Sequence, residues 1–189
     1  MEKTNTSMLP LGSATHAAKR AADVLFVLQN KAQLDPQALS DQLNKVLEGY
    51  GEQSKVAAAD LVDLKAASDK LYAVFTAQDV GVIAALLNAI LSEYAAIPRL
   101  SAHNTSAWHL HVDSNDHAPW AEWFAASSAL ALALLLADKQ RSPGGICAAT
   151  TCERPFIDLG KGGGRNYCSP RCATRERVAA HRRKVMASS

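Results

Sequence analysis

Apolar residues recur at intervals of three and four along most of the first hundred positions, as one buried helical face requires. Four segments follow this pattern: residues 11–30, 39–50, 61–75 and 83–94. Asp35, followed by Pro36, precedes the second segment, and Asp79 precedes the fourth. Aspartate caps helix N-termini and proline fits the first helical turn. The pattern therefore predicts an N-terminal bundle of helices.

The period changes after Ile97, where Pro98 interrupts the helical pattern. Apolar and polar residues then alternate in the order Trp108, His109, Leu110, His111, Val112 and Asp113. This alternation predicts a half-buried strand, which we pair with residues 99–103 as a β-hairpin. Pro119 begins a last long helix to about residue 137, and its many alanines and leucines place it at the centre of the bundle.

This long helix does not predict a membrane span. Its uncharged stretch, residues 123–137, is 15 residues long, whereas roughly 20 are needed to cross a bilayer. The first 12 residues lack the charged head and apolar run of a secretory signal. We therefore expect a cytoplasmic protein with no membrane among its partners.

Composition and charge divide the chain. With 189 residues, 48% of them hydrophobic and 20% charged, it has the composition of a soluble globular protein. The net charge of +2 combines −6 up to Asp138 (9 basic, 15 acidic) with +8 beyond it (11 basic, 3 acidic). We predict a helical domain at residues 1–140 and a small basic unit at 141–189 that binds an anionic partner. The turn-rich residues 141–145 would link the two as a tethered appendage.

All four cysteines lie in this basic unit, as Cys147-x4-Cys152 and Cys168-x3-Cys172. Two close pairs separated by a loop of 15 residues are typical of four thiolates that converge on zinc. Two disulfides would need an oxidising compartment, and four free thiols would leave this apolar-poor segment without a core. We therefore predict one structural Zn²⁺, with no open coordination position for catalysis.

The residues between the pairs predict the shape of this zinc unit. Residues 156–158 and 166–168 read as two strands of a hairpin joined by the glycine-rich turn 160–164. Ser169 and Pro170 then begin a helix that runs to about residue 185. The predicted fold class is thus mainly α, a helical domain with a short β-hairpin followed by a small treble-clef-like zinc finger.

The last helix is strongly basic. Together with the residues just before it, it carries Arg165, Arg171, Arg175, Arg177, Arg182, Arg183 and Lys184. At 100° per residue, Arg171, Arg175 and Arg182 share one stripe. A solvated basic helix is one interpretation, and phosphate contact by a zinc-braced helix is the other. The scarcity of acidic residues here favours DNA contact.

The chain also resembles a known family. The matching features are Trp108-His-Leu-His111, the helix ending LLLAD, Cys147-x4-Cys152, Phe156-x-Asp158, Arg165-Asn-Tyr-Cys-Ser169, and Cys172 followed by Arg175 and His181-Arg-Arg-Lys184. In these it resembles the CGNR-type zinc finger proteins, bacterial proteins in which an N-terminal helical ABATE domain, described as a stress-induced transcription regulator, precedes a zinc finger. This chain has Cys172-Ala-Thr-Arg175 where the family spells Cys-Gly-Asn-Arg, and the last cysteine pair is one residue closer. The nearest trace of the family's N-terminal aspartate and phenylalanine is Asp23 and Phe26.

His109, His111 and Asp113 would project from one face of the predicted strand. Two imidazoles at this spacing can share a metal, line a ligand pocket, or form an ordinary edge of the core. Among these we name Trp108, His109 and His111 as candidate pocket residues.

Taken together, these patterns predict a zinc-dependent DNA-binding transcription regulator that is not an enzyme. Its partners would be DNA, a small-molecule effector and a second copy in a homodimer. A zinc-finger module for protein or RNA without sequence-specific DNA reading is the alternative interpretation, and an enzyme built on the histidine strand is a third.

Overall fold

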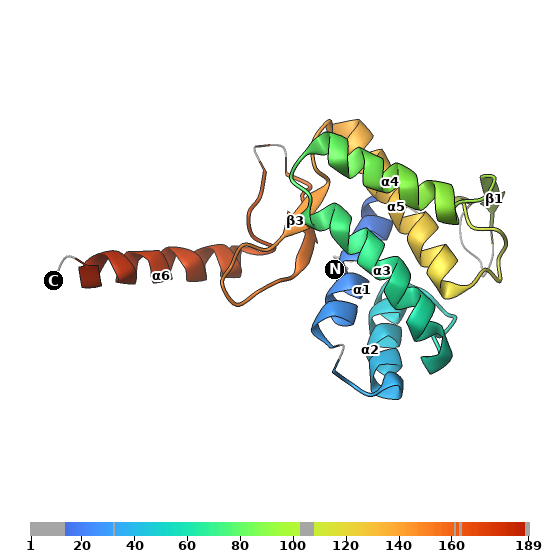
Figure 1. The fold of residues 1–189 in the computed structure, drawn as a ribbon, viewed down its shortest axis with the longest axis horizontal. Coiled ribbons are helices and arrows are strands. Elements are labelled where there is room, and N and C mark those ends of the chain that lie inside the picture. The colour runs from blue at the N-terminus through green and yellow to red at the C-terminus, as the bar shows by residue number, and fades with distance from the viewer. Residues whose placement is uncertain (1–13, 32, 103–107, 161, 163, 188–189) are drawn as a thin grey trace, which may run out of the picture.

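The computed structural model describes residues 14–31, 33–102, 108–160, 162, 164–187. Their secondary structure comprises α1 (Ala14–Asn30), α2 (Pro36–Gly49), the short 3₁₀ helix η1 (Ala58–Asp60), α3 (Leu61–Thr76), α4 (Val80–Tyr94), β1 (Arg99–Ser101), β2 (His109–His111), α5 (Trp120–Lys139), β3 (Gly144–Ile146), β4 (Pro155–Ile157) and α6 (Pro170–Ala187). Helices α1 to α5 form a bundle, and α6 extends away from it to the C-terminus (Figure 1). The predicted mainly α fold is confirmed. The expected helix start at residue 11 and strand end at residue 103 lie outside the described residues.

Helix α5 is central to the bundle, as its apolar sequence predicts. It packs against α1, α3 and α4, and Phe124 and Leu132 on it are almost completely buried. Within the described ranges, α5 is the helix whose length and composition would suffice to cross a membrane, with a mean hydropathy of 1.5. Half of that apolar window is buried inside the bundle, and a core helix passes the same test.

Two of the predicted helix starts carry side-chain caps. The Asp35 carboxylate accepts hydrogen bonds from the backbone N–H groups of Gln37 and Ala38, at 3.1 and 3.0 Å. The Asp79 carboxylate accepts one from Val82 N–H at 2.9 Å. These bonds satisfy donors that the first helical turn leaves without a backbone partner. Helices α2 and α4 therefore begin where their aspartates indicate.

The first hairpin lies at one end of the bundle. β1 and β2 pair antiparallel, with Arg99 opposite His111 and Ser101 opposite His109. Leu110 is 51% exposed, whereas His111 and Asp113 are buried. The exposure alternates from Trp108 to His111, with the histidines on the inner face, but the alternation ends there because Val112 is buried as well.

The second hairpin is a correction. β4 pairs antiparallel with β3, not with residues 166–168, and the register places Gly144 opposite Ile157. A Cβ at Gly144 would lie 2.1 Å from the Phe156 carbonyl oxygen, so this close pairing requires glycine. Among the described residues, the backbone contact of residues 166–168 with the preceding loop is a hydrogen bond from Ala148 N–H to the Asn166 carbonyl at 2.8 Å.

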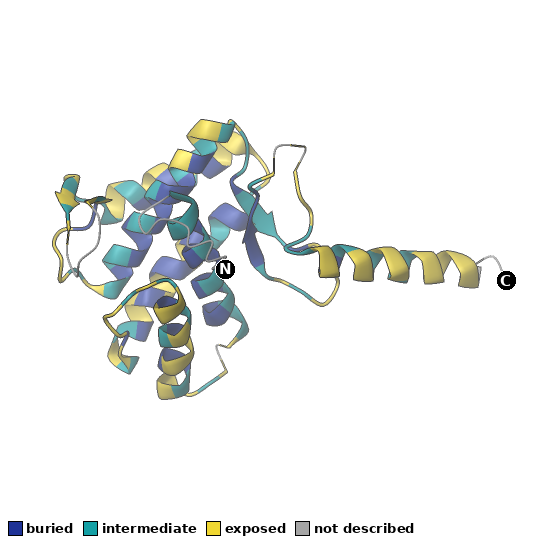
Figure 2. Ribbon diagram, turned by 180° about the vertical axis from the view of Figure 1, so that it is seen from behind, coloured by how far each residue is buried: buried dark blue, intermediate teal, exposed yellow. Residues whose placement is uncertain are grey.

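The second hairpin also joins the finger to the bundle. β4 packs on α1, and β3 on α3. Every residue of β4 is buried (Figure 2), and Ile157 belongs to the bundle's core. At its edge, Arg154 lies 2.7 Å from Asp23 of α1, with its guanidinium 4.5 Å from the Phe26 ring. The link after α5 is therefore part of a packed interface, which the expectation of a tethered appendage did not foresee.

Candidate zinc centre and basic helix

The four cysteines converge from three parts of the chain. Cys147 follows β3, Cys152 precedes β4, Cys168 precedes α6 and Cys172 lies in its first turn. All four are free thiols, and their sulfur atoms lie within 4.8 Å of one another. The Sγ–Sγ distance is 3.8 Å between Cys152 and Cys168 and 3.7 Å between Cys168 and Cys172. A tetrahedron with zinc–sulfur bonds of about 2.3 Å has edges of about 3.8 Å. The sulfur positions therefore fit one tetrahedral zinc ion.

Neighbouring groups hold these sulfurs in place. Cys168 N–H donates to the Cys147 sulfur at 3.4 Å, and the Arg175 guanidinium donates to the Cys172 sulfur at 3.6 Å. The Ser169 hydroxyl, which accepts from Cys172 N–H, lowers the pKa of the Cys172 thiol to about 7. Burial raises the pKa of Cys168 to about 12. Zinc binds cysteine as the thiolate, so the bound ion holds all four sulfurs deprotonated.

Family comparison agrees with this geometry. Residues 145–184 match the family model of the CGNR zinc finger. The matched segment begins inside β3 and ends near the end of α6, so it includes the four cysteines and most of the basic helix. No curated protein sequence matches the chain with significance. The C-terminal unit is thus a zinc finger that binds one structural zinc through Cys147, Cys152, Cys168 and Cys172.

A buried carboxylate braces the glycine-rich loop of the CGNR zinc finger. Asp158 pairs with Arg141 at 2.6 Å and accepts backbone N–H bonds from Gly160 at 3.0 Å and Arg165 at 3.1 Å. Burial raises the pKa of Asp158, but these hydrogen bonds outweigh that effect and leave it below its ordinary value. Asp158 therefore acts as an ionised anchor for both ends of the loop.

Two arginines that the sequence assigned to DNA contact the finger itself. The Arg165 guanidinium donates to the carbonyls of Tyr167 and Cys168, at 3.2 and 3.0 Å. Arg175 reaches the sulfur of Cys172. A four-thiolate zinc site carries a net negative charge, and both cations offset it. These two side chains therefore support the zinc site, whatever else they contact.

The other predicted DNA-contacting residues lie along α6. Arg171, Arg177, Arg182, Arg183 and Lys184 are all exposed. Figure 2 shows α6 exposed along most of its length, and its basic residues surround it as the helical spacing indicates. Glu176, the one acidic residue of α6, accepts hydrogen bonds from the Thr150 backbone and hydroxyl, at 2.9 and 3.2 Å. The Glu176 carboxylate thus binds the finger and does not pair with a basic residue of α6 in these contacts.

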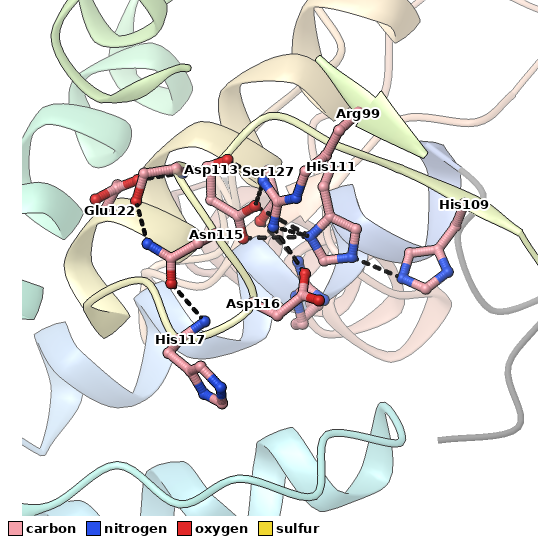
Figure 3. A network of polar contacts seen from close by, with 11 residues as sticks. Arg99, His109, His111, Asp113, Asn115, Asp116, His117, Glu122 and Ser127 are labelled. Carbon is pink, nitrogen blue, oxygen red and sulfur yellow. Dashed lines mark hydrogen bonds and ion pairs between the residues drawn. The ribbon is translucent and has the colours of Figure 1, made fainter. Parts of the chain in front are cut away.

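The candidate pocket residues are brought together only in part. His109 and His111 are in contact, with their Nε2 atoms 2.9 Å apart (Figure 3). Trp108 is 73% exposed. A cavity of about 480 Å³ between α3, α4 and the start of α5 is lined by Glu93, Tyr94 and Glu122, among others, and by none of these three. The ligand-pocket assignment stays a prediction.

Sequence reasoning missed the residues that join distant segments. Arg20 is buried, pairs with Glu52 at 2.5 Å and donates to the Ser127 hydroxyl at 2.9 Å. Arg99 was not singled out either, although it pairs with Asp113. Long sequence separation gives such pairs no local pattern. Asp23 and Phe26, which in the sequence are only the nearest trace of a family signature, both contact Arg154 in the structure.

Proposed function

We propose that this protein is a zinc-dependent, DNA-binding transcription regulator in which α6 contacts DNA. The observation that supports this proposal is the position of α6, which projects from the molecule (Figure 1) and carries six basic residues and one acidic residue. A helix about 10–12 Å across fits a major groove about 12 Å wide. At about 1.5 Å per residue, its 18 residues extend for about 27 Å.

Zinc would act by fixing the base of this helix. Cys172 lies in the first turn of α6, and Cys168 lies two residues before the helix begins. The metal therefore anchors a helix that packs little against the bundle. Because the four thiolates fill the coordination sphere, we propose stoichiometric binding rather than catalysis.

Positive charge supports a nucleic-acid partner. The outer half of α6 carries Arg182, Arg183 and Lys184, and Arg177 lies one turn before them. Such a cluster favours contact with phosphates. A single helix reaches few bases, so we assign dimerisation or effector sensing to the helical bundle, because specific sites are commonly read by dimers.

A second candidate function rests on the apolar residues of α6. Val178 is 45% exposed, Val185 53% and Met186 81%. Exposed apolar side chains on a projecting helix are suited to a protein partner. These residues favour a zinc-finger module that binds a protein. The RNA-binding form of this alternative is separated from DNA binding by the competition experiment below.

The test is duplex DNA binding by the zinc-loaded protein, measured by fluorescence anisotropy at several salt concentrations. Each neutralised phosphate lowers the slope of log affinity against log salt by about 0.9, so three to five of them give roughly −3 to −5. The variant Arg182→Ala/Arg183→Ala should bind more weakly, and the slope should flatten by about one unit for each phosphate that is no longer neutralised. We choose these residues over Arg175 because Arg175 also contacts the zinc ligand Cys172.

The matched control removes the same charge elsewhere. Lys31→Ala/Lys45→Ala changes two lysines of the helical bundle and should leave the affinity and slope unchanged. Equal DNA binding by wild type and the Arg182→Ala/Arg183→Ala variant would refute DNA contact through α6. Full competition by an unrelated single-stranded RNA would instead favour the RNA-binding module.

A further inference from the structure

We infer that His109 and His111 form a second metal site, separate from the cysteine cluster, that takes a divalent transition-metal ion. The observation is the position of the two imidazoles, whose Nε2 atoms lie 2.9 Å apart (Figure 3). Imidazole nitrogen is a preferred ligand of Zn²⁺, Ni²⁺ and Cu²⁺. The inference does not depend on DNA binding by α6.

The hairpin brings these rings together. His109 and His111 are two residues apart on β2, so their side chains leave the same face of the strand. Their ring centroids are 4.7 Å apart, at an interplanar angle of 45°. His111 is opposite Arg99 in the register. The strand pairing therefore fixes the positions from which both rings start.

The carboxylate of Asp113 sets the orientation of His111. Its oxygens lie 3.0 and 3.3 Å from the His111 Nδ1, and its side chain is 5% exposed. The carboxylate accepts the Nδ1–H, which leaves a lone pair on Nε2, the atom that faces His109. A carboxylate behind a histidine is the usual outer partner of a metal-bound imidazole.

The separation of the two nitrogens fits a shared metal ion. Two imidazoles that bind one metal at about 2.0–2.1 Å, with an angle of about 90° between them, have nitrogens about 2.9 Å apart. Without metal, the same separation holds an N–H···N hydrogen bond between the rings. Metal binding therefore requires the proton on the His109 Nε2 to move to Nδ1 of the same ring, and both rings to turn so that their Nε2 lone pairs converge on the ion.

The charges around the pair favour a cation. Arg99 pairs with Asp113 and with Asp116, each at 2.8 Å. With both histidines neutral, these three residues carry a net charge of −1, which partly balances a divalent ion. Arg99 already neutralises the buried Asp113, and the side chain of Asp116 is 50% exposed, so solvent screens the remaining charge and its contribution is modest. Two imidazole ligands are fewer and less charged than four thiolates, so we expect weaker binding here than at the cysteine cluster.

The experiment uses Ni²⁺ as the probe. The full-length, zinc-loaded chain is dialysed to equilibrium against a series of Ni²⁺ concentrations, and both metals are counted by elemental analysis. We expect one Ni²⁺ per chain while the zinc is retained. His109→Gln should abolish this binding over the same concentrations. Asp113→Asn should weaken it by about 10–100-fold, the usual effect of removing an outer partner.

The control is His117→Gln, a histidine of the following loop, which should bind Ni²⁺ like the wild type. His109 is only half-buried, so His109→Gln is expected to fold, and unchanged thermal unfolding in the absence of Ni²⁺ checks this. The inference is overturned if the wild type takes up no Ni²⁺ beyond the zinc, or if His109→Gln binds as well as the wild type. An equal loss in His117→Gln would also overturn it, because the uptake would then be unspecific.

Discussion

Removal of zinc should unfold α6 and leave the helical bundle folded. The bundle has its own core, in which Leu25, Leu71 and Phe124 are almost completely buried. β4 remains packed on this core through Ile157. In contrast, α6 is exposed along most of its length and is attached to the finger by Cys172 in its first turn. Without the metal, little tertiary packing would stabilise it.

The expected size of the effect follows from helix lengths. α6 contributes 18 of the 100 residues in the six described α-helices. Isolated helices of about this length are only marginally stable in water, because nucleation is costly. A chelator should therefore reduce the helical circular dichroism signal at 222 nm by up to about 18%, and the remaining signal should still melt cooperatively.

The assay compares wild type, Cys172→Ala and Arg183→Ala, each with and without chelator. Cys172→Ala should show the reduced signal under both conditions, because three thiolates no longer close the site. Arg183→Ala, an exposed residue of the same helix, should behave like wild type. A loss of half the signal or more would show that the bundle depends on zinc. An unchanged signal after complete zinc removal would show that α6 is stable alone. Either result would refute this reasoning.

Three further predictions concern stability, each measured by urea unfolding. Gly144→Ala places a methyl group against the carbonyl of the opposite strand and should lower the free energy of unfolding by about 1–3 kcal/mol. Gly145→Ala is the control, because its new methyl group would lie 3.8 Å from the nearest non-neighbouring atom, and it should lower the free energy clearly less. Equal losses would contradict the strand pairing. Asp158→Asn should cost about 1.5–3 kcal/mol at neutral pH. The pKa of Asp158 in the folded protein lies below its ordinary 3.8, so the ionised carboxylate stabilises the fold above pH 3.8. This contribution is lost as the pH falls through the folded pKa. A difference in unfolding free energy between Asp158→Asn and wild type that persists below that pH would argue against an ionic role. Arg20→Met leaves Glu52 without its cation and should cost about 3 kcal/mol, and a neutral result would show that Glu52 is solvated instead.

Sequence patterns located the helices and the metal ligands because both depend on local spacing. The apolar periodicity and the Asp35 and Asp79 caps are short-range features, and the structure confirms the helices they predicted. The cysteine spacing identified the zinc ligands for the same reason, since each pair must bend the chain around one ion. The basic character of α6 is likewise a property of composition alone.

Only the tertiary structure decided which segments pair and which charges have partners. The sequence predicted a hairpin between residues 156–158 and 166–168, but β3 is the partner of β4 because glycine permits the close approach. The attachment of the finger through Arg154 and Asp23 joins positions 131 residues apart, and no local pattern encodes such an ion pair. The facing nitrogens of His109 and His111 likewise depend on the hairpin and on the buried carboxylate behind them. Local spacing determines which elements form, whereas packing between distant segments determines which side chains meet.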